Sequence, residues 1–195
     1  MAEDIVALKA ELRRKLRFRR DQYVVQLDEF VRAIAFRAPP TPLRRLLSDA
    51  RCVAGYAAAG SEAPVEPLLA TAAQAGVATA LPHFSARNPT LSFAMWRPGD
   101  LLETGPWRVD QPLGTAEMLI PDLLLCPLLG FDRQGGRIGQ GGGHYDRYFA
   151  AHSTALRIGI AWSVQEIDAI PLERHDLPLD AVLTEQEWIL TGGRI

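Results

Sequence analysis

The sequence contains no apolar run that approaches the roughly 20 residues needed to cross a membrane. It also lacks a signal-peptide segment near its start, where the acidic residues Glu3 and Asp4 stand instead. Cysteine occurs only twice, at Cys52 and Cys126, and both positions fall within predicted buried strands. Two packed thiols explain these cysteines better than a disulfide or a metal site. We therefore expect a cytoplasmic protein that does not contact a membrane.

Charge and histidine spacing give no sign of a partner. The formal net charge of −2 provides no general attraction for nucleic acid. The four histidines show no spacing typical of metal ligands. No serine or cysteine occupies a nucleophile elbow. Together these absences argue against a nucleic-acid partner, a histidine metal centre and covalent catalysis through a side chain.

The composition is that of an ordinary globular protein. The 195 residues are 48% hydrophobic and 23% charged, which is enough for one domain with a substantial core. We find no internal repeat, low-complexity segment or second domain. The prediction is a single domain over residues 1–195 that acts as a monomer.

Strands and helices are predicted to alternate along the chain, which is typical of an α/β protein. Pro82 is expected to end the second strand, and Trp107–Val109 to form a short extended piece. We expect a three-layer, Rossmann-like sandwich with a mostly parallel sheet and helices on both faces. The predicted helices are Ile5–Arg20, Leu27–Phe36, Leu43–Leu47, Pro64–Gly76 and the turns from His144 to Phe149. The predicted strands are Arg51–Ala57, Val77–Leu81, Leu91–Trp96, Leu123–Cys126, Leu156–Trp162, Ala181–Thr184 and Glu187–Leu190.

The segment Leu128–Tyr148, LLGFDRQGGRIGQGGGHYDRY, is the most informative part of the sequence. It leaves a predicted buried strand and enters a predicted helix, and glycine fills most positions between Gly135 and Gly143. Unpaired amide groups and the positive end of a helix dipole would then converge on one place, which favours an anion. The segment matches neither GxxxxGK[ST] nor GxGxxG. A phosphate-binding loop is favoured over a tight structural turn.

Two charged residues accompany this glycine loop. Arg137 supplies a forked donor, and Asp146 lies one turn into the helix. A carboxylate there stabilises the helix dipole whatever the function. Beside a polyphosphate it is also a plausible Mg²⁺ ligand, since Mg²⁺ usually takes one or two carboxylates and keeps water and phosphate oxygens elsewhere.

The first predicted helix carries an apolar stripe with a basic stripe beside it. Two interpretations of the basic stripe remain open: a solvated face, or a face directed at an anionic ligand. The apolar residues are Ile5, Leu8, Leu12 and Leu16, and the basic residues are Lys9, Arg13, Arg17 and Arg20.

Glu62 lies in a loop that follows a predicted strand, as the glycine loop does. Both loops leave the carboxyl ends of their strands, where α/β sheets gather ligands, so Glu62 can come close to the glycine loop. Without such a contact, Glu62 and Asp180 are ordinary solvated acids and Trp107 is a core residue.

These residues together resemble the 5-formyltetrahydrofolate cyclo-ligase family, also called methenyltetrahydrofolate synthetases. The stretch GFDRQGGRIGQGGGHYDRY is similar to the family's GFD followed by a GxRLGxGxGYYD-type loop. Weaker similarities flank it in the family's order, at Lys9–Arg13, Gly60–Leu69, Trp107–Pro112 and Asp176–Thr184. The resemblance spans nearly the whole chain. One departure is His144, which stands where the family usually has Tyr or Phe.

The resemblance implies a ligase that closes a C–N bond with ATP as co-substrate and Mg²⁺ as cofactor. ATP would phosphorylate the formyl oxygen of 5-formyltetrahydrofolate, and nitrogen 10 would attack the activated carbon. Loss of phosphate would leave 5,10-methenyltetrahydrofolate, ADP and phosphate. No protein nucleophile is needed, because phosphoryl transfer depends mainly on positioning and charge neutralisation.

The resemblance also implies residue roles. The catalytic cations would be Arg137, Lys9 and Arg13, and Mg²⁺ would be bound by Asp146 and Asp180. The only partners would be the substrates ATP and 5-formyltetrahydrofolate. The pterin would be bound by Glu62, Trp107, His144 and Tyr145. The ATP site would comprise Lys9, Arg13, Arg137, Ile138, Gly139, Gln140, Gly141, Gly142, Gly143, His144 and Tyr145.

Three alternatives remain open. The chain can be a nucleotide- or folate-binding protein without turnover, or another phosphate-handling enzyme on a similar sheet, such as a relative of sugar-phosphate isomerases or CoA transferases. It can also be an RNA-binding module that uses the basic first helix, but no aromatic platforms are interleaved with that helix.

Overall fold

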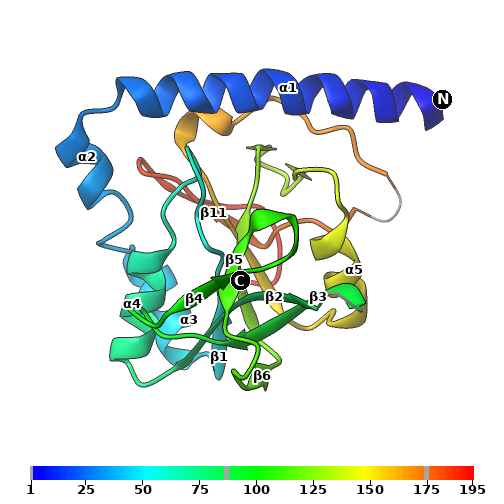
Figure 1. Ribbon diagram of the computed structural model, residues 1–195. Coiled ribbons are helices and arrows are strands. Elements are labelled where there is room, and N and C mark those ends of the chain that lie inside the picture. The colour runs from blue at the N-terminus through cyan, green and yellow to red at the C-terminus, as the bar shows by residue number, and fades with distance from the viewer. Residues whose placement is uncertain (1, 86–87, 174–175) are drawn as a thin grey trace.

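The computed structural model describes residues 2–85, 88–173 and 176–195, and its centre is an eight-stranded sheet (Figure 1). The spatial order of the strands is β12-β11-β10-β7-β1-β2-β3-β6. The five central strands, from β11 to β2, run parallel, and β12, β3 and β6 pair antiparallel at the two edges. The strands are β1 (Cys52–Ala54), β2 (Ala78–Ser85), β3 (Asn88–Met95), β6 (Met118–Leu119), β7 (Leu123–Pro127), β10 (Leu156–Ile160), β11 (Ala181–Leu183) and β12 (Trp188–Leu190).

The predicted succession of strand, helix and strand between residues 51 and 81 is confirmed. β1 pairs parallel with β2 in the register Val53↔Thr79, and helix α4 connects the two strands. Parallel neighbours need such a crossover, because a tight turn cannot join them. The helices are α1 (Ala2–Gln26), α2 (Glu29–Ile34), α3 (Thr41–Asp49), α4 (Glu66–Gln74) and α5 (His144–Ala151).

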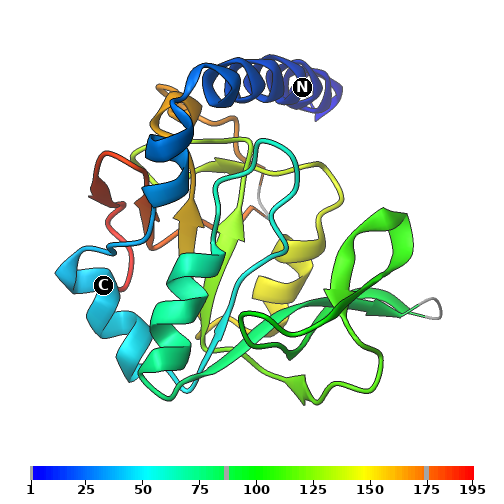
Figure 2. The same ribbon diagram turned by 60° about the vertical axis from the view of Figure 1, so that its left-hand side comes forward.

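Both faces of the sheet are covered, as predicted for a three-layer fold. Strand β7 alternates its side chains between two cores, with Leu123 and Leu125 in one core and Leu124 and Cys126 in the other. The first core contains residues of α3 and α4, and the second contains Phe149 of α5. Figure 2 shows α3 and α4 on one side of the central strands and α5 on the other. The mixed, mostly parallel α/β architecture is therefore confirmed.

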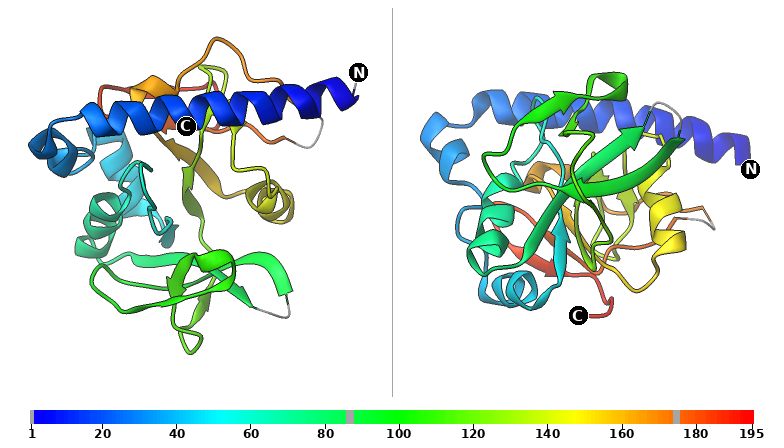
Figure 3. Two further views of the ribbon diagram at one scale, coloured as in Figure 1. Left: turned by 45° about the horizontal axis from the view of Figure 1, so that its top comes forward. Right: turned by 60° about the horizontal axis from the view of Figure 1, so that its bottom comes forward.

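Helix α1 belongs to neither layer but runs across one end of the sheet (Figure 3). Leu16 is 3% exposed and packs with Leu129, Ile138 and Ile170 in a small third cluster. Lys9 and Arg20 are each 5% exposed, whereas Leu8 is 47% exposed. The predicted apolar stripe is therefore wrong at Leu8, and the inward face of α1 includes basic residues.

The glycine segment is not one continuous loop. It contains a two-stranded hairpin, β8 (Gly130–Phe131) and β9 (Arg137–Ile138). In the hairpin turn, Asp132 Oδ1 accepts hydrogen bonds from the backbone N–H groups of Gln134 (3.0 Å) and Gly136 (2.8 Å). The glycines before Arg137 therefore build this turn, and those after Ile138 form a separate loop.

Three local predictions are wrong. Strand β2 does not end at Pro82 but continues to Ser85. Its neighbour β1 ends at Ala54, which pairs with Ala80, so from Pro82 onward β2 pairs only with β3. A proline is tolerated there because one side of the strand has no partner that needs its N–H. The segment predicted to be extended at Trp107 is the 3-10 helix η1 (Pro106–Arg108), at the tip of the hairpin of β4 (Leu102–Thr104) and β5 (Asp110–Pro112). The helix predicted over Leu27–Phe36 is shorter, because Asp28 caps α2 by accepting from Phe30 and Val31 N–H.

Candidate functional site

A cleft of about 630 Å³ lies where the central parallel strands reach their carboxyl ends. Its walls come from α1, from the segments after β1 and β7, from β2, and from the loop that leads into α5. Thirteen of the fifteen predicted site residues line it: Lys9, Arg13, Glu62, Arg137, Ile138, Gly139, Gln140, Gly141, Gly142, Gly143, His144, Tyr145 and Asp146. The prediction that Glu62 lies near the glycine loop is confirmed, since Gln140 Nε2 donates to Glu62 Oε1 at 3.4 Å.

The loop between β9 and α5 contains glycines in backbone conformations that other residues rarely adopt. Gly141 has φ of +102° and Gly143 has φ of +63°, a region that side chains rarely allow. Gly143 is the N-cap of α5 and has no side chain to satisfy the first amides of the helix. No N-cap side chain therefore covers this end of α5, and a ligand in the cleft can lie against its first turn.

Helix α1 closes over this loop with its basic residues. Arg13 Nε donates to the carbonyl of Gly139 at 3.1 Å, and Arg17 donates to Gln140 Oε1 at 2.5 Å. The basic stripe divides between the two interpretations left open for it. Lys9 and Arg13 line the cleft, whereas Arg17 is exposed to solvent.

Arg137 lines the cleft and is almost fully buried. Its side chain is 7% exposed, forms an ion pair with Asp146, and lies 5.9 Å from the ring centre of Tyr145 and 5.2 Å from that of Phe149. In the described part of the chain, Arg137 Nε and the Tyr145 hydroxyl are buried without a hydrogen-bond partner. Buried polar groups are normally paired, so a ligand that supplies their partners fits this place. Burial raises the pKa of Tyr145 well above its usual value, so its hydroxyl stays a neutral donor.

Lys9 lines the cleft but is already paired. Its ammonium group lies 2.7 Å from Glu173 and 2.5 Å from Asp176. Burial opposes its charge, but the hydrogen bonds to Asp176 and Glu173 outweigh burial and raise the pKa of Lys9 above its usual value. Sequence reasoning missed these two acids as cleft residues, although Asp176 opens the closing segment of the resemblance.

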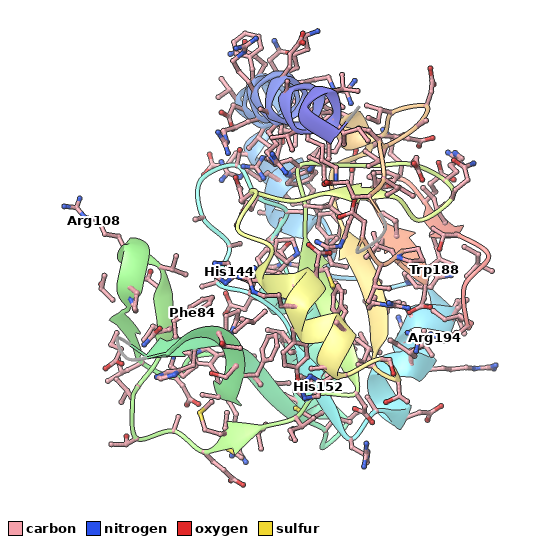
Figure 4. All side chains as sticks on the ribbon, turned by 90° about the vertical axis from the view of Figure 1, so that its right-hand side faces the viewer. Phe84, Arg108, His144, His152, Trp188 and Arg194 are labelled. Atoms are coloured by element: carbon pink, nitrogen blue, oxygen red, sulfur yellow. The ribbon has the colours of Figure 1, made fainter. Side chains whose placement is uncertain are left out.

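His144 faces Phe84 across the mouth of the cleft, as Figure 4 shows. Their rings meet edge to face with centres 5.2 Å apart. Arg147 Nη2 lies 3.2 Å from His144 Nδ1, and an arginine can only donate. His144 Nδ1 is therefore the acceptor in this contact. Sequence reasoning also missed Phe84 and Tyr56, which give the cleft much of its aromatic lining.

Two predicted site residues are not among those that line the cleft. The side chain of Trp107 lies outside the described part of the structure. Asp180 precedes β11, at the amino end of the sheet and therefore opposite the cleft. Its carboxylate is 2% exposed, accepts from Arg194 Nη2 at 2.8 Å and lies 3.5 Å from Arg157 Nε. Figure 4 shows Arg194 and His144 on opposite sides of α5. Asp180 is an internal structural anion in this geometry.

The cleft carries carboxylates that a metal ion could use together with a bound ligand. No group of three or more His, Cys, Asp and Glu side chains that could hold a metal occurs within the described residues. Mg²⁺ does not need such a group when a ligand brings phosphate oxygens. The side chains of Asp146 and Asp176, 23% and 14% exposed, both line the cleft. The donors present fit Mg²⁺ held jointly with a phosphate.

The fold and the cleft define an α/β protein with a glycine loop lining a cleft at the carboxyl end of its sheet. Among the described residues, no helix is both long and apolar enough to cross a membrane. The model of the 5-formyltetrahydrofolate cyclo-ligase family matches residues 5–185. The chain belongs to this family of ligases.

Individual relatives agree with the family match. The chain is 34% identical over 163 residues to the 5-formyltetrahydrofolate cyclo-ligase of Mycolicibacterium smegmatis, covering 76% of this chain and 80% of the relative. It is 32% identical over 151 residues to the Escherichia coli K12 5-formyltetrahydrofolate cyclo-ligase, covering 71% and 82%. The NMR structure of Aquifex aeolicus 5,10-methenyltetrahydrofolate synthetase has the same fold, with a TM-score of 0.74 at 24% identity over 96% of this chain and 95% of that one.

Proposed function

We propose that the chain catalyses the ATP-dependent cyclisation of 5-formyltetrahydrofolate to 5,10-methenyltetrahydrofolate, with release of ADP and phosphate. Family membership supports this reaction. The observation that carries the proposal for this chain is the cleft, where the glycine loop, its cations and Glu62 face one space. All the residues assigned below line this cleft in one copy of the chain, so the proposal requires only a monomer.

The triphosphate of ATP is assigned to the glycine loop. The first amides of α5 and the amides of residues 139–143 would bind phosphate oxygens, and Arg13 and Arg137 would neutralise their charge. The Nε of Arg137, which has no hydrogen-bond partner among the described residues, supplies a donor for a phosphate oxygen. Lys9 contributes to the phosphate site only if a phosphate displaces or shares its partners Glu173 and Asp176.

The reduced pterin is assigned to the part of the cleft around Glu62. A carboxylate accepts hydrogen bonds from the N–H groups of a pterin ring, and His144, Tyr145 and Phe84 offer ring surfaces and a hydroxyl donor. This arrangement would set the formyl oxygen next to the γ-phosphate. The protein then positions two substrates and needs no nucleophile of its own. Trp107 remains a candidate for this pocket.

Mg²⁺ is the proposed cofactor of the phosphate site. Asp146 and Asp176 would hold it, in place of the pair Asp146 and Asp180 that the resemblance implies, because both line the cleft whereas Asp180 lies at the opposite end of the sheet. When bound, Mg²⁺ supplies positive charge to the phosphate oxygens.

The test mixes the purified protein with 5-formyltetrahydrofolate, ATP and Mg²⁺ and follows the near-ultraviolet absorbance of the methenyl product. We expect product in a one-to-one ratio with ADP, and none without ATP. Binding of both ligands without product would identify a binding protein that lacks turnover. ATP hydrolysis that is independent of the folate would indicate a different phosphate-handling enzyme.

A further inference from the structure

Glu62 lines the cleft, and its carboxylate contacts two other lining residues and Arg20, which does not line the cleft. Glu62 Oε2 accepts from the backbone N–H of Ala59 at 3.2 Å, and Oε1 accepts from Gln140 Nε2 at 3.4 Å. Arg20 Nη1 lies 3.8 Å from the same Oε1, and the two side chains are 7% and 16% exposed. A carboxylate has about four acceptor positions, so these contacts fix its orientation and still leave room for a ligand donor.

Arg20 also holds the neighbouring residue of the same loop. Its Nε donates to Ser61 Oγ at 2.9 Å, and Ser61 Oγ in turn donates to Asp21. Arg20 and Asp21 are adjacent on α1, and both side chains form hydrogen bonds with the hydroxyl of Ser61. These bonds attach the loop to the helix.

The rest of the loop is anchored independently. Trp162 Nε1 donates to the carbonyl of Ser61 at 3.0 Å, and Arg32 donates to that of Gly60 at 3.3 Å. These bonds fix the backbone of the loop, whereas Arg20 lies against the carboxylate of Glu62. Loss of Arg20 should therefore loosen the carboxylate without releasing the whole loop.

We propose that Arg20 is a positioning residue that orients the Glu62 carboxylate toward the folate, acting from behind the cleft through Ser61 and Asp21. Arg20 does not line the cleft, so it does not contact the substrate. Its 5% exposure in a polar network excludes a solvent-facing role. The inference rests on the proposed function, because it takes the folate as the ligand of Glu62.

The test compares Arg20→Met and Arg20→Lys with Arg14→Gln, which removes an exposed arginine from the same helix. We expect Arg20→Met to raise the KM for 5-formyltetrahydrofolate by about 10-fold or more, because the substitution removes both the ion pair with Glu62 and the hydrogen bond to Ser61. The KM for ATP should stay within about 2-fold, and Arg20→Lys should recover part of the loss because it restores the charge but not the fork. Arg14→Gln should change neither constant.

Thermal unfolding and folate binding without ATP complete the experiment. If Arg20→Met does not fold, Ser61→Ala replaces it, and its KM for 5-formyltetrahydrofolate should rise about 3-fold because one hydrogen bond is lost. The inference would be overturned if the KM for 5-formyltetrahydrofolate stayed at the wild-type value, or if it rose by the same factor as the KM for ATP. Wild-type protein that binds folate without turnover would instead contradict the proposed function, and the effect of Arg20 on binding would still decide the inference.

Discussion

The guanidinium group of Arg137 makes several kinds of contact. It pairs with Asp146, lies against the rings of Tyr145 and Phe149, and keeps Nε unpaired in the described structure. A lysine offers charge but neither the planar fork nor the stacking surface. The role proposed for Arg137 therefore depends on its shape as well as its charge.

Arg137→Lys should lower kcat/KM for ATP by about 10-fold or more, because the phosphate loses a charge-assisted hydrogen bond worth about 1.5–3 kcal/mol. Steady-state kinetics with ATP as the varied substrate measures this change. Arg133→Lys is the control, since Arg133 pairs with Glu166 and Glu187 on the surface and does not line the cleft. Equal ATP kinetics in the two variants would remove Arg137 from the phosphate site.

Gly141 tests the backbone of the glycine loop. An alanine at its φ of +102° is strained, and the new methyl group would lie 3.4 Å from Arg13. We expect Gly141→Ala to raise the KM for ATP by about 10-fold, because the strained backbone turns its amides away from the phosphates. Kinetic assays and urea unfolding should be measured together.

Gly99→Ala is the matched control for this strain. Gly99 has φ of +98°, and nothing lies within 4 Å of the position of the added methyl group. Both substitutions should cost about 1 kcal/mol of stability, but only Gly141→Ala should affect ATP. If the KM for ATP rises equally in both variants, backbone strain alone, and not the position of Gly141 in the glycine loop, explains the rise.

Among the elements, α1 was correctly predicted to be a helix, but the sequence did not show which of its residues face inward. The periodicity of the sequence indicated a helix, and its basic residues left two interpretations open. Periodicity describes one helix alone, so it could not show that Lys9 and Arg20 face inward while Leu8 faces solvent. Their partners come from distant parts of the chain: Lys9 pairs with Glu173 and Asp176, and Arg20 lies beside Glu62.

Leu16 is the apolar anchor of α1. It is 3% exposed and packs with Leu129, Ile138 and Ile170, next to the glycine loop. Leu16→Ala should cost about 2–4 kcal/mol in the free energy of unfolding and speed amide exchange in α1, because it leaves a cavity under the helix. Urea unfolding and hydrogen exchange measure these effects.

Phe18→Ala provides the comparison on the same helix, since Phe18 is 66% exposed. Its cost should stay within about 0.5 kcal/mol. If the two substitutions destabilise the protein equally, α1 is not held by the cluster around Leu16.

At the scale of the whole molecule, the sequence predicted the layers and the position of the site. Alternating strands and helices indicated a parallel sheet, and the carboxyl-end rule brought Glu62 to the glycine loop. The hairpin β4–β5 was missed because all three residues of β4 are exposed, so this strand has no buried apolar pattern. Glu173 was missed because its approach to Lys9 joins residues 164 positions apart, which no local pattern encodes.

Asp180 shows how a motif match can mislead about a role. Burial opposes its charge, but hydrogen bonds from Arg194 and from the backbone of Arg157 outweigh burial and lower the pKa of Asp180 below its usual 3.8. Because the folded pKa is the lower one, the ionised carboxylate contributes its full stability above about pH 4. This contribution is lost as the pH falls through the folded pKa.

Asp180→Asn should therefore lower the free energy of unfolding by about 3 kcal/mol at pH 7, because it leaves Arg157 and Arg194 without their anion. The difference from the wild type should shrink as the pH falls below 3.8, which urea unfolding at several pH values can measure. Asp168→Asn, at an exposed position, should cost less than about 0.5 kcal/mol. A stable Asp180→Asn variant with a raised Mg²⁺ requirement would restore the metal-binding role.

The central claim is that the glycine loop binds the triphosphate of ATP while Glu62 binds the pterin in the same cleft. A crystal structure with a non-hydrolysable ATP analogue, Mg²⁺ and 5-formyltetrahydrofolate tests it most directly. We predict phosphate oxygens within hydrogen-bonding distance of the amides of residues 139–143, and the pterin ring against Glu62. Phosphates bound elsewhere, with this loop unchanged and free of ligand, would contradict the account.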